Sequence, residues 1–140
     1  MPDDSFIPLQ GGCLCGAVRY RLLSPPTDSG YCHCRICRRA AGAPLLLFAT
    51  VPKPDMEIVR GTPKHYRSSP SGERWFCGDC GTQLYMQVES EPDTTDFTVA
   101  SLDTPETVPP TFHIWHGSRI AWFDTADALE LFPRGRTTDP

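Results

Sequence analysis

The sequence predicts a mainly β fold made of short antiparallel sheets, with little helix. Its 140 residues include 15 prolines and 11 glycines, which divide the chain into short segments and disfavour long helices. Several segments alternate apolar and polar residues or are rich in aromatic and β-branched side chains, as strands are. Seven cysteines fall into three close groups, which suits a small domain stapled by bound zinc.

The expected strands are short and are separated by turn residues. Residues 17–23 and 83–88 alternate apolar and polar side chains, and residues 45–51 form an apolar run of strand length. A turn at Gly61-Thr-Pro63 separates two further strands, and proline-rich breaks separate the later ones. In chain order, the expected strands cover residues 17–23, 45–51, 55–60, 64–68, 83–88, 96–102, 111–116 and 120–123.

Two segments have weak helical character. Residues 38–43 are expected to form one or two helical turns that end at Gly42 and Pro44. Residues 125–132 have a weak helical spacing and stop at Pro133. We therefore expect only a small part of the chain to be helical.

Length and charge limit the domain organisation and the partners. A chain of 15.6 kDa is expected to form one domain, with an acidic N-terminal extension over residues 1–10 and a polar, mobile tail over residues 133–140. The net charge of −4 and the lack of a long basic run argue against nucleic acid as a partner. No apolar stretch is long enough to cross a membrane, and the N-terminus does not look like a signal peptide. We therefore expect a cytoplasmic protein, whose cysteines serve as metal ligands or reactive thiols rather than as disulfides.

Two cysteine pairs have the spacing of a closed metal site. Cys13 and Cys15 are two residues apart, so on an extended strand their side chains would share one face while Leu14 faces the core. Cys77 and Cys80 have the spacing and the glycines of a zinc knuckle. Together the two pairs predict one closed four-sulfur zinc site that joins the start of the chain to its middle.

The remaining three cysteines, Cys32, Cys34 and Cys37, predict a second metal site that keeps an open position. A water, a substrate thiol or a nearby side chain could take the fourth place. Three arginines surround this group and could offset its negative charge or bind a carboxylate of the ligand; they are Arg35, Arg38 and Arg39. Three other interpretations stay open: His33 or another residue completes a closed structural site, the three thiols are redox-active, or their grouping is accidental.

Histidines and aromatic residues give weaker signals. His33 lies between two expected ligands and would point away from their metal, so we expect it to support the site rather than bind the ion. His113 and His116 lie three apart on an expected strand and should face opposite sides. The large aromatic residues are expected in the core rather than at a substrate; they are Trp75, Phe76, Trp115, Trp122 and Phe123.

Four segments carry a resemblance to a known family. The segments GGCLCGAVRY, CHCRICRRAAGAP, RWFCGDCGTQL and HIWHGSRIAWF resemble the glutathione-dependent formaldehyde-activating enzyme family, which shares its domain with centromere protein V. The resemblance covers residues 11–132 and implies the Mss4-like β fold. It also implies a structural zinc on Cys13, Cys15, Cys77 and Cys80, and a second zinc on Cys32, Cys34 and Cys37 near the glutathione site.

The function expected from this resemblance is that of a zinc-dependent carbon–sulfur lyase. Such an enzyme acts on adducts of glutathione, or another thiol, with an aldehyde, as an S-hydroxymethylglutathione synthase does. One alternative is a non-catalytic zinc module that binds glutathione or a protein partner, and another is a thiol buffer or metal-handling protein. The expected ligands are zinc and a small thiol or aldehyde, and the sequence leaves the oligomeric state open.

Overall fold

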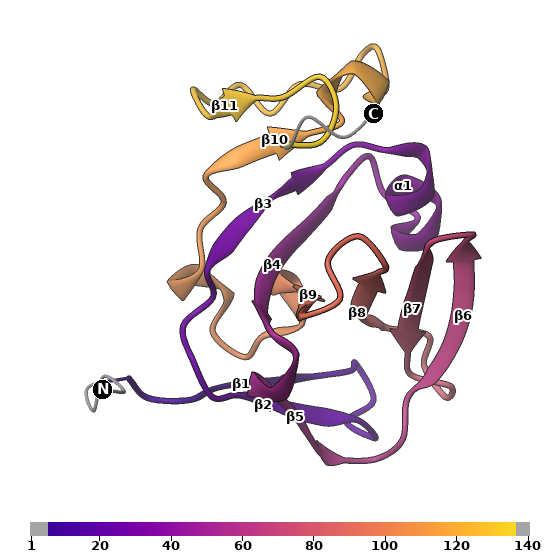
Figure 1. The fold of residues 1–140 in the computed structure, drawn as a ribbon, viewed down its shortest axis with the longest axis vertical. Helices are drawn as coiled ribbons and strands as arrows, with labels where there is room; N and C mark the ends of the chain where they lie inside the picture. The colour runs from indigo at the N-terminus through magenta and orange to yellow at the C-terminus, as the bar shows by residue number, and fades with distance from the viewer. Residues whose placement is uncertain (1–5, 137–140) are drawn as a thin grey trace.

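The computed structural model of the chain describes residues 6–136. Residues 1–5 of the expected N-terminal extension and residues 137–140 of the expected tail lie outside this range. The described part is mainly β, with an eight-stranded sheet, a three-stranded sheet and a single short α-helix (Figure 1). The prediction of a mainly β fold with little helix is confirmed.

The smaller sheet lies at one end of the molecule (Figure 1). It consists of β1 (Leu9–Gly12), β2 (Arg19–Leu22) and β5 (Met56–Arg60), in the order β1-β2-β5 with antiparallel pairing throughout. Tyr20 and Leu22 of β2 are fully buried and point toward the larger sheet's core residues.

The larger sheet has the order β11-β10-β3-β4-β9-β8-β7-β6. Two of its pairings, β10 with β3 and β10 with β11, are parallel, and the others are antiparallel. Its strands are β3 (Asp28–Cys32), β4 (Leu46–Pro52), β6 (Lys64–Ser69), β7 (Gly72–Phe76), β8 (Gln83–Val88), β9 (Thr94–Thr98), β10 (Phe112–Ile114) and β11 (Glu130–Leu131). Short 3-10 turns lie at Lys53–Asp55, Val99–Ser101, Pro105–Thr107 and His116–Ser118.

The two faces of the larger sheet contribute to two separate cores. Successive side chains of a strand point to opposite faces, and β4 shows this alternation clearly. Ala49 and Val51 belong to the core shared with the smaller sheet, whereas Leu46 and Phe48 belong to the core beneath the helix. Each core contains buried cysteines, and this places the two cysteine groups on opposite sides of the larger sheet.

The helix α1 (Arg35–Ala41) directly follows the triple-cysteine segment. Cys34 is its N-cap, and the Cys34 sulfur accepts a hydrogen bond from the backbone N–H of Cys37. Gly42 ends the helix in the left-handed conformation, at φ 62°, with its N–H donating to the carbonyl of Arg38. The predicted helical turns are therefore present, but they begin at Arg35, because the cap lies within the cysteine motif itself.

The prediction for the C-terminal part was wrong in two places. Residues 125–132 do not form a helix; the strand β11 occupies part of the segment and the rest is irregular. Two aspartate side chains accept hydrogen bonds from backbone N–H groups two residues on, Asp124 from Ala126 and Asp127 from Leu129. Such local turns compete with a helix, and Ala126 has a positive φ of 54°. Residues 120–123 form a turn rather than the expected strand.

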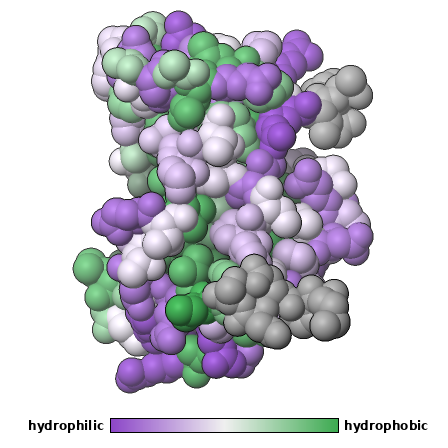
Figure 2. Space-filling model, turned by 90° about the vertical axis from the view of Figure 1, so that its left-hand side faces the viewer, coloured by the Kyte–Doolittle hydropathy of each residue, from purple (hydrophilic) through white to green (hydrophobic). Residues whose placement is uncertain are grey.

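The aromatic residues are less buried than expected. Trp122 is 78% exposed, so its assignment to the core was wrong. The other four expected core aromatics are only partly buried; they are Trp75, Phe76, Trp115 and Phe123. On the face shown in Figure 2, hydrophobic areas are small and lie between hydrophilic ones. Between residues 6 and 136, no helix has both the length and the apolar character needed to cross a membrane.

Candidate functional site

Four cysteines from two distant segments meet at the end of the core between the sheets. The ligand atoms of Cys13, Cys15, Cys77 and Cys80 all lie within 4.8 Å of one another. The Sγ atoms of Cys13 and Cys15 are 3.6 Å apart, and those of Cys15 and Cys77 are 3.8 Å apart. Sulfurs bound tetrahedrally to zinc at about 2.3 Å lie about 3.8 Å from one another. The donor set therefore fits a zinc ion.

The backbone around this first cluster supports its thiolates. The N–H of Val18 donates to the Cys13 sulfur over 3.2 Å, and the N–H of Asp79 donates to the Cys77 sulfur over 3.4 Å. The hydroxyl of Thr82 lies 3.2 Å from the Cys80 sulfur, and this hydrogen bond lowers the pKa of Cys80 to about 5. Donors aimed at sulfur favour the ionised form that binds a metal.

The loop that carries Cys13 and Cys15 corrects one expectation. The two residues do not lie on an extended strand, because β1 ends at Gly12 and a turn follows. Leu14 stands at the tip of that turn and is 89% exposed instead of facing the core. The turn brings the two sulfurs together, as the spacing predicted, but by a different backbone conformation.

The second cluster lies on the other face of the larger sheet, where β3 runs into α1. The ligand atoms of Cys32, Cys34 and Cys37 lie within 4.8 Å of one another. Cys32 and Cys37 are buried, whereas Cys34 is partly exposed. Within residues 6–136, no further histidine, cysteine or carboxylate atom joins this group. Three converging thiols with one accessible side fit a metal ion with an open coordination position.

The pKa values of the thiols in the second cluster are shifted in opposite directions. Hydrogen bonds from the thiols of Cys32 and Cys37 lower the pKa of Cys34 to about 2. The reciprocal contact with Cys34 raises the pKa of Cys32. Cys34 is also the partly exposed cysteine of this cluster.

Arg74 of β7 is a site residue that the sequence did not indicate. Its side chain is 8% exposed, and its Nη2 donates to the Cys37 sulfur over 3.2 Å. Its Nε donates to the hydroxyl of Ser68 over 3.1 Å. No carboxylate forms an ion pair with Arg74 among the described residues. Among the described residues, the cysteine sulfur and the Ser68 hydroxyl are therefore the side-chain groups to which this buried guanidinium donates.

The three arginines that the sequence did indicate have different surroundings. Arg35 and Arg39 are exposed on α1, the helix that directly follows Cys34. Arg38 is partly buried, and its Nε donates to the backbone carbonyl of His33 over 3.1 Å. Their suggested contact with a ligand carboxylate stays a prediction.

A buried histidine pair lies behind the second cluster. The ring of His33 is 1% exposed, and its Nε2 lies 2.7 Å from Nδ1 of His113. His33 therefore does not complete the cysteine site. The ring of His116 also lies close to the histidine pair, with its centroid 5.7 Å from that of His113. The strand β10 ends at Ile114, and Trp115 has a positive φ of 54°, so the backbone turns before it reaches His116. The expectation that His113 and His116 face opposite sides was wrong for this reason.

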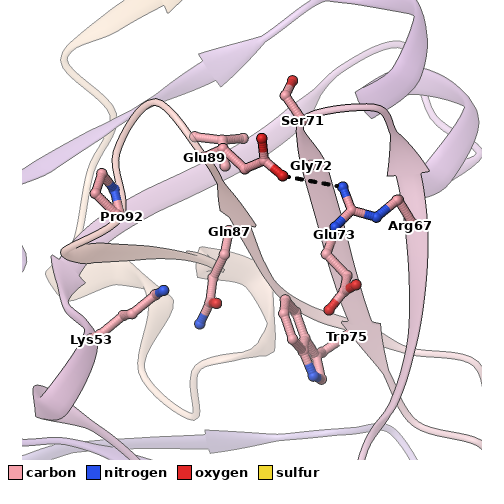
Figure 3. A pocket seen from close by; sticks show the side chains of 10 residues that line it. Lys53, Arg67, Ser71, Gly72, Glu73, Trp75, Gln87, Glu89 and Pro92 are labelled. Carbon is pink, nitrogen blue, oxygen red and sulfur yellow. Dashed lines mark hydrogen bonds and ion pairs between the residues drawn. The ribbon is translucent and has the colours of Figure 1, made fainter.

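A shallow groove of about 280 Å³ is lined mainly by residues of β7 and β8 and of the segments around them (Figure 3). Trp75 forms part of its wall and stacks on Tyr85 at 4.9 Å between ring centroids. Arg67 and Glu89 pair across its rim at 3.3 Å. No cysteine lines this groove, so the candidate chemistry belongs to the clusters.

Residues 8–118 match the family model described as glutathione-dependent formaldehyde-activating enzyme. The chain belongs to this family. The matched range contains both cysteine clusters and Arg74. It ends before the irregular segment that carries Asp127 and before β11.

Two curated relatives and one solved structure are similar to the chain. A protein of Schizosaccharomyces pombe, named as an uncharacterized lyase, is 36% identical over 55% of the chain and 56% of its own length. A protein of Halomonas elongata, provisionally named as a glutathione-dependent formaldehyde-activating enzyme, is 32% identical over 73% of the chain and 70% of its own length. A crystal structure of a Rhodobacter sphaeroides protein aligns with a TM-score of 0.57 and 32% identity, over 67% of the chain and 87% of that protein. The chain thus spans little more than half of the Schizosaccharomyces pombe relative.

Proposed function

We propose that the chain is a zinc-dependent carbon–sulfur lyase that acts on the adduct of glutathione, or a similar thiol, with formaldehyde or another small aldehyde. Family membership and the names of the relatives support a lyase that handles glutathione. The observation that carries the proposal is the second cluster, where three sulfurs converge and the partly exposed Cys34 leaves one side open. A closed, four-ligand site would leave no position for a substrate.

The two clusters have different proposed roles. Cys13, Cys15, Cys77 and Cys80 would hold a structural zinc that ties the loop after β1 to the loop after β7. Cys32, Cys34 and Cys37 would hold the zinc used in the reaction. When bound there, zinc supplies Lewis acidity, which stabilises a thiolate and polarises a carbonyl group. A reducing compartment such as the cytoplasm would keep all seven thiols available as ligands.

The proposed reaction is a reversible addition. The sulfur of the thiol attacks the aldehyde carbon, a C–S bond forms, and the electron pair of the C=O bond moves to oxygen, which takes up a proton. In the reverse direction the hydroxyl proton leaves, the carbonyl re-forms and the C–S bond breaks. The thiol must lose its proton for the forward step, so the site has to favour negative charge on sulfur.

The residues around the second cluster suit this requirement. A metal ion with two positive charges and three thiolates would carry a net charge of −1, and the guanidinium of Arg74 offsets that charge at the Cys37 sulfur. Arg35 and Arg39, which are exposed on α1, are the proposed contacts for the glutathione carboxylates, whereas Arg38 donates to the backbone carbonyl of His33 between two of the cysteines.

The test is a measurement of exchange between glutathione, formaldehyde and their adduct by magnetisation-transfer NMR. This addition proceeds without an enzyme, so each rate is compared with a protein-free sample of the same composition. The zinc-loaded protein should accelerate the exchange, and C34S should remove the acceleration while the protein stays folded. If the wild-type protein binds two zinc ions and glutathione but does not change the exchange rate, the chain is a binding module and the lyase proposal is wrong.

A further inference from the structure

The residue between Cys32 and Cys34 is anchored at every polar group except one. The backbone N–H of His33 donates to the carbonyl of Ile114 over 3.1 Å, and its carbonyl accepts from Arg38 over 3.1 Å. Its ring is held at Nε2 by His113. Side chains alternate along extended backbone, so holding the His33 ring on one side fixes the directions of the two cysteines on the other.

A carboxylate from the C-terminal segment holds the second histidine of the pair. Nε2 of His113 lies 3.1 Å from both Oδ1 and Oδ2 of Asp127, and the hydroxyl of Thr125 is 3.4 Å away. His113 is 1% exposed, whereas the Asp127 side chain is 28% exposed. Asp127 is itself fixed, because its Oδ1 accepts from the N–H of Leu129 over 3.0 Å. The result is a continuous chain of contacts from Asp127 through His113 to His33.

The chemistry of the carboxylate sets the direction of these hydrogen bonds. An ionised carboxylate can only accept, so Nε2 of His113 carries a hydrogen. In a neutral ring, Nδ1 of His113 is then an acceptor, and the hydrogen in the 2.7 Å contact belongs to Nε2 of His33. Nδ1 of His33 is left as a bare acceptor, and it is buried without a hydrogen-bond partner.

We propose that Asp127 is a positioning residue for the second cluster: acting through His113, it fixes the tautomer and orientation of His33 and so holds Cys32 and Cys34 toward one metal ion. The role in metal binding rests on the proposed function, whereas the assignment of the imidazole tautomers does not. Asp127 lies outside the matched range of residues 8–118, so the C-terminal segment becomes part of the site. Partners that orient a metal-bound histidine change metal affinity by about 10–100-fold when they are removed. Asp127 acts further from the metal, so we expect an effect at the lower end of this range.

The first test measures the imidazole tautomers directly, by ¹⁵N NMR of the protein labelled at its histidines. In the wild type, His33 and His113 should both carry their hydrogen on Nε2. D127A should shift the ring signals of both residues, and D127N should do so more weakly, because its amide oxygen still accepts. A wild-type His113 with its hydrogen on Nδ1 would overturn the proposal, and this readout does not depend on any variant folding.

The second test measures zinc affinity by competition with a chelator. D127A should weaken binding of one of the two zinc ions by about tenfold and leave the other unchanged, with D127N between D127A and the wild type. The matched control is D124N, which removes the same charge from the same loop while its amide oxygen can still accept from Ala126; it should leave both affinities unchanged. Equal second-site affinity in D127A and the wild type would contradict the proposal.

The two readouts separate this proposal from the proposed function. If the wild type binds only one zinc ion, the lyase mechanism fails, and the Asp127 proposal is then decided by the tautomers and by alkylation of the cysteine loop. Faster reaction of Cys34 with iodoacetamide in D127A than in the wild type would support a positioning role for Asp127. Unchanged ring signals and an unchanged alkylation rate would overturn it.

Discussion

The buried guanidinium of Arg74 donates a hydrogen bond to the sulfur of Cys37 over 3.2 Å. The two residues come from different elements, β7 and α1, and Cys37 is part of the second core. A buried charge is costly unless it is compensated, and no carboxylate of the described residues forms an ion pair with Arg74. The contact therefore links the stability of this core to the charge on the cysteine cluster.

The first prediction concerns this contact. R74M should weaken zinc binding at the second cluster by about 10–100-fold, because it removes a charged donor from a ligand sulfur. R74K should recover only part of the loss, since a lysine keeps the charge but lacks the planar fork that also reaches Ser68. Zinc affinity is measured by chelator competition. R67M is the control, because Arg67 is exposed on the neighbouring strand; equal effects of R67M and R74M would contradict the assignment.

The second prediction concerns the first cluster. C77S should leave most of the protein unfolded, because a structural zinc site contributes on the order of 10 kcal/mol and a domain has only about 5–15 kcal/mol of stability. C34S should stay folded, since the loss of the Cys34 thiol affects only the second, open metal site. Circular dichroism and thermal unfolding compare the two variants. A C77S protein with the wild-type melting temperature would show that the first cluster is not a structural metal site.

The third prediction concerns Asp96 of β9, a partly buried residue whose carboxylate accepts a hydrogen bond from Thr50 over 2.6 Å. Burial raises the pKa of Asp96 to about 6, from 3.8. The folded state thus binds the proton of Asp96 more tightly than the unfolded state does. The contribution of Asp96 to the free energy of unfolding therefore falls as the pH rises from about 4 to about 6, and is constant above that. D96N removes this penalty and should gain up to about 3 kcal/mol above pH 7.

Urea unfolding at pH 4 and pH 8 checks this prediction. The difference in the free energy of unfolding between D96N and the wild type should be small at pH 4 and large at pH 8. The control is D93N, at an exposed aspartate near the start of the same strand, which should show little change at either pH. The opposite trend for D96N, with the gain at pH 4, would contradict a raised pKa.

The fourth prediction concerns the two exposed arginines of α1. If Arg35 and Arg39 bind the glutathione carboxylates, R35Q/R39Q should raise KM for glutathione about tenfold or more and change kcat less, since hydrogen bonds to charged groups contribute about 1.5–3 kcal/mol. Steady-state rates at several glutathione concentrations separate the two constants. R60Q, at an exposed arginine of β5, is the control. An unchanged KM in R35Q/R39Q would exclude these residues as carboxylate contacts.

The cysteine spacing was enough to predict which sulfurs meet. Cysteines two or three residues apart have few ways to be far apart, which groups Cys32, Cys34 and Cys37 and forms each of the two pairs. That the two distant pairs meet was expected because a closed zinc site needs four ligands. The backbone between them was less predictable. Leu14 was expected in the core because an extended strand was assumed, and its 89% exposure follows from the turn that replaces that strand.

Contacts between distant segments could not be predicted from local patterns. Arg74 reaches Cys37 only because its side chain, on β7 of the larger sheet, points to the side of the sheet where α1 lies. Asp127 reaches His113 only because β11 pairs with β10 and the segment before it is irregular. The same segment was expected to be helical, since its spacing gave no sign of the aspartate turns. In each case the pairing of distant strands, rather than the residues nearby in the sequence, decides the contact.

Native mass spectrometry of the purified protein tests the central claim most directly, because it counts bound zinc ions and bound glutathione in one spectrum. The wild type should carry two zinc ions and take up one glutathione, whereas C34S should carry one zinc ion and no glutathione. A wild-type protein with a single zinc ion, or a C34S protein that still binds glutathione, would contradict an open, thiol-binding metal site at Cys32, Cys34 and Cys37.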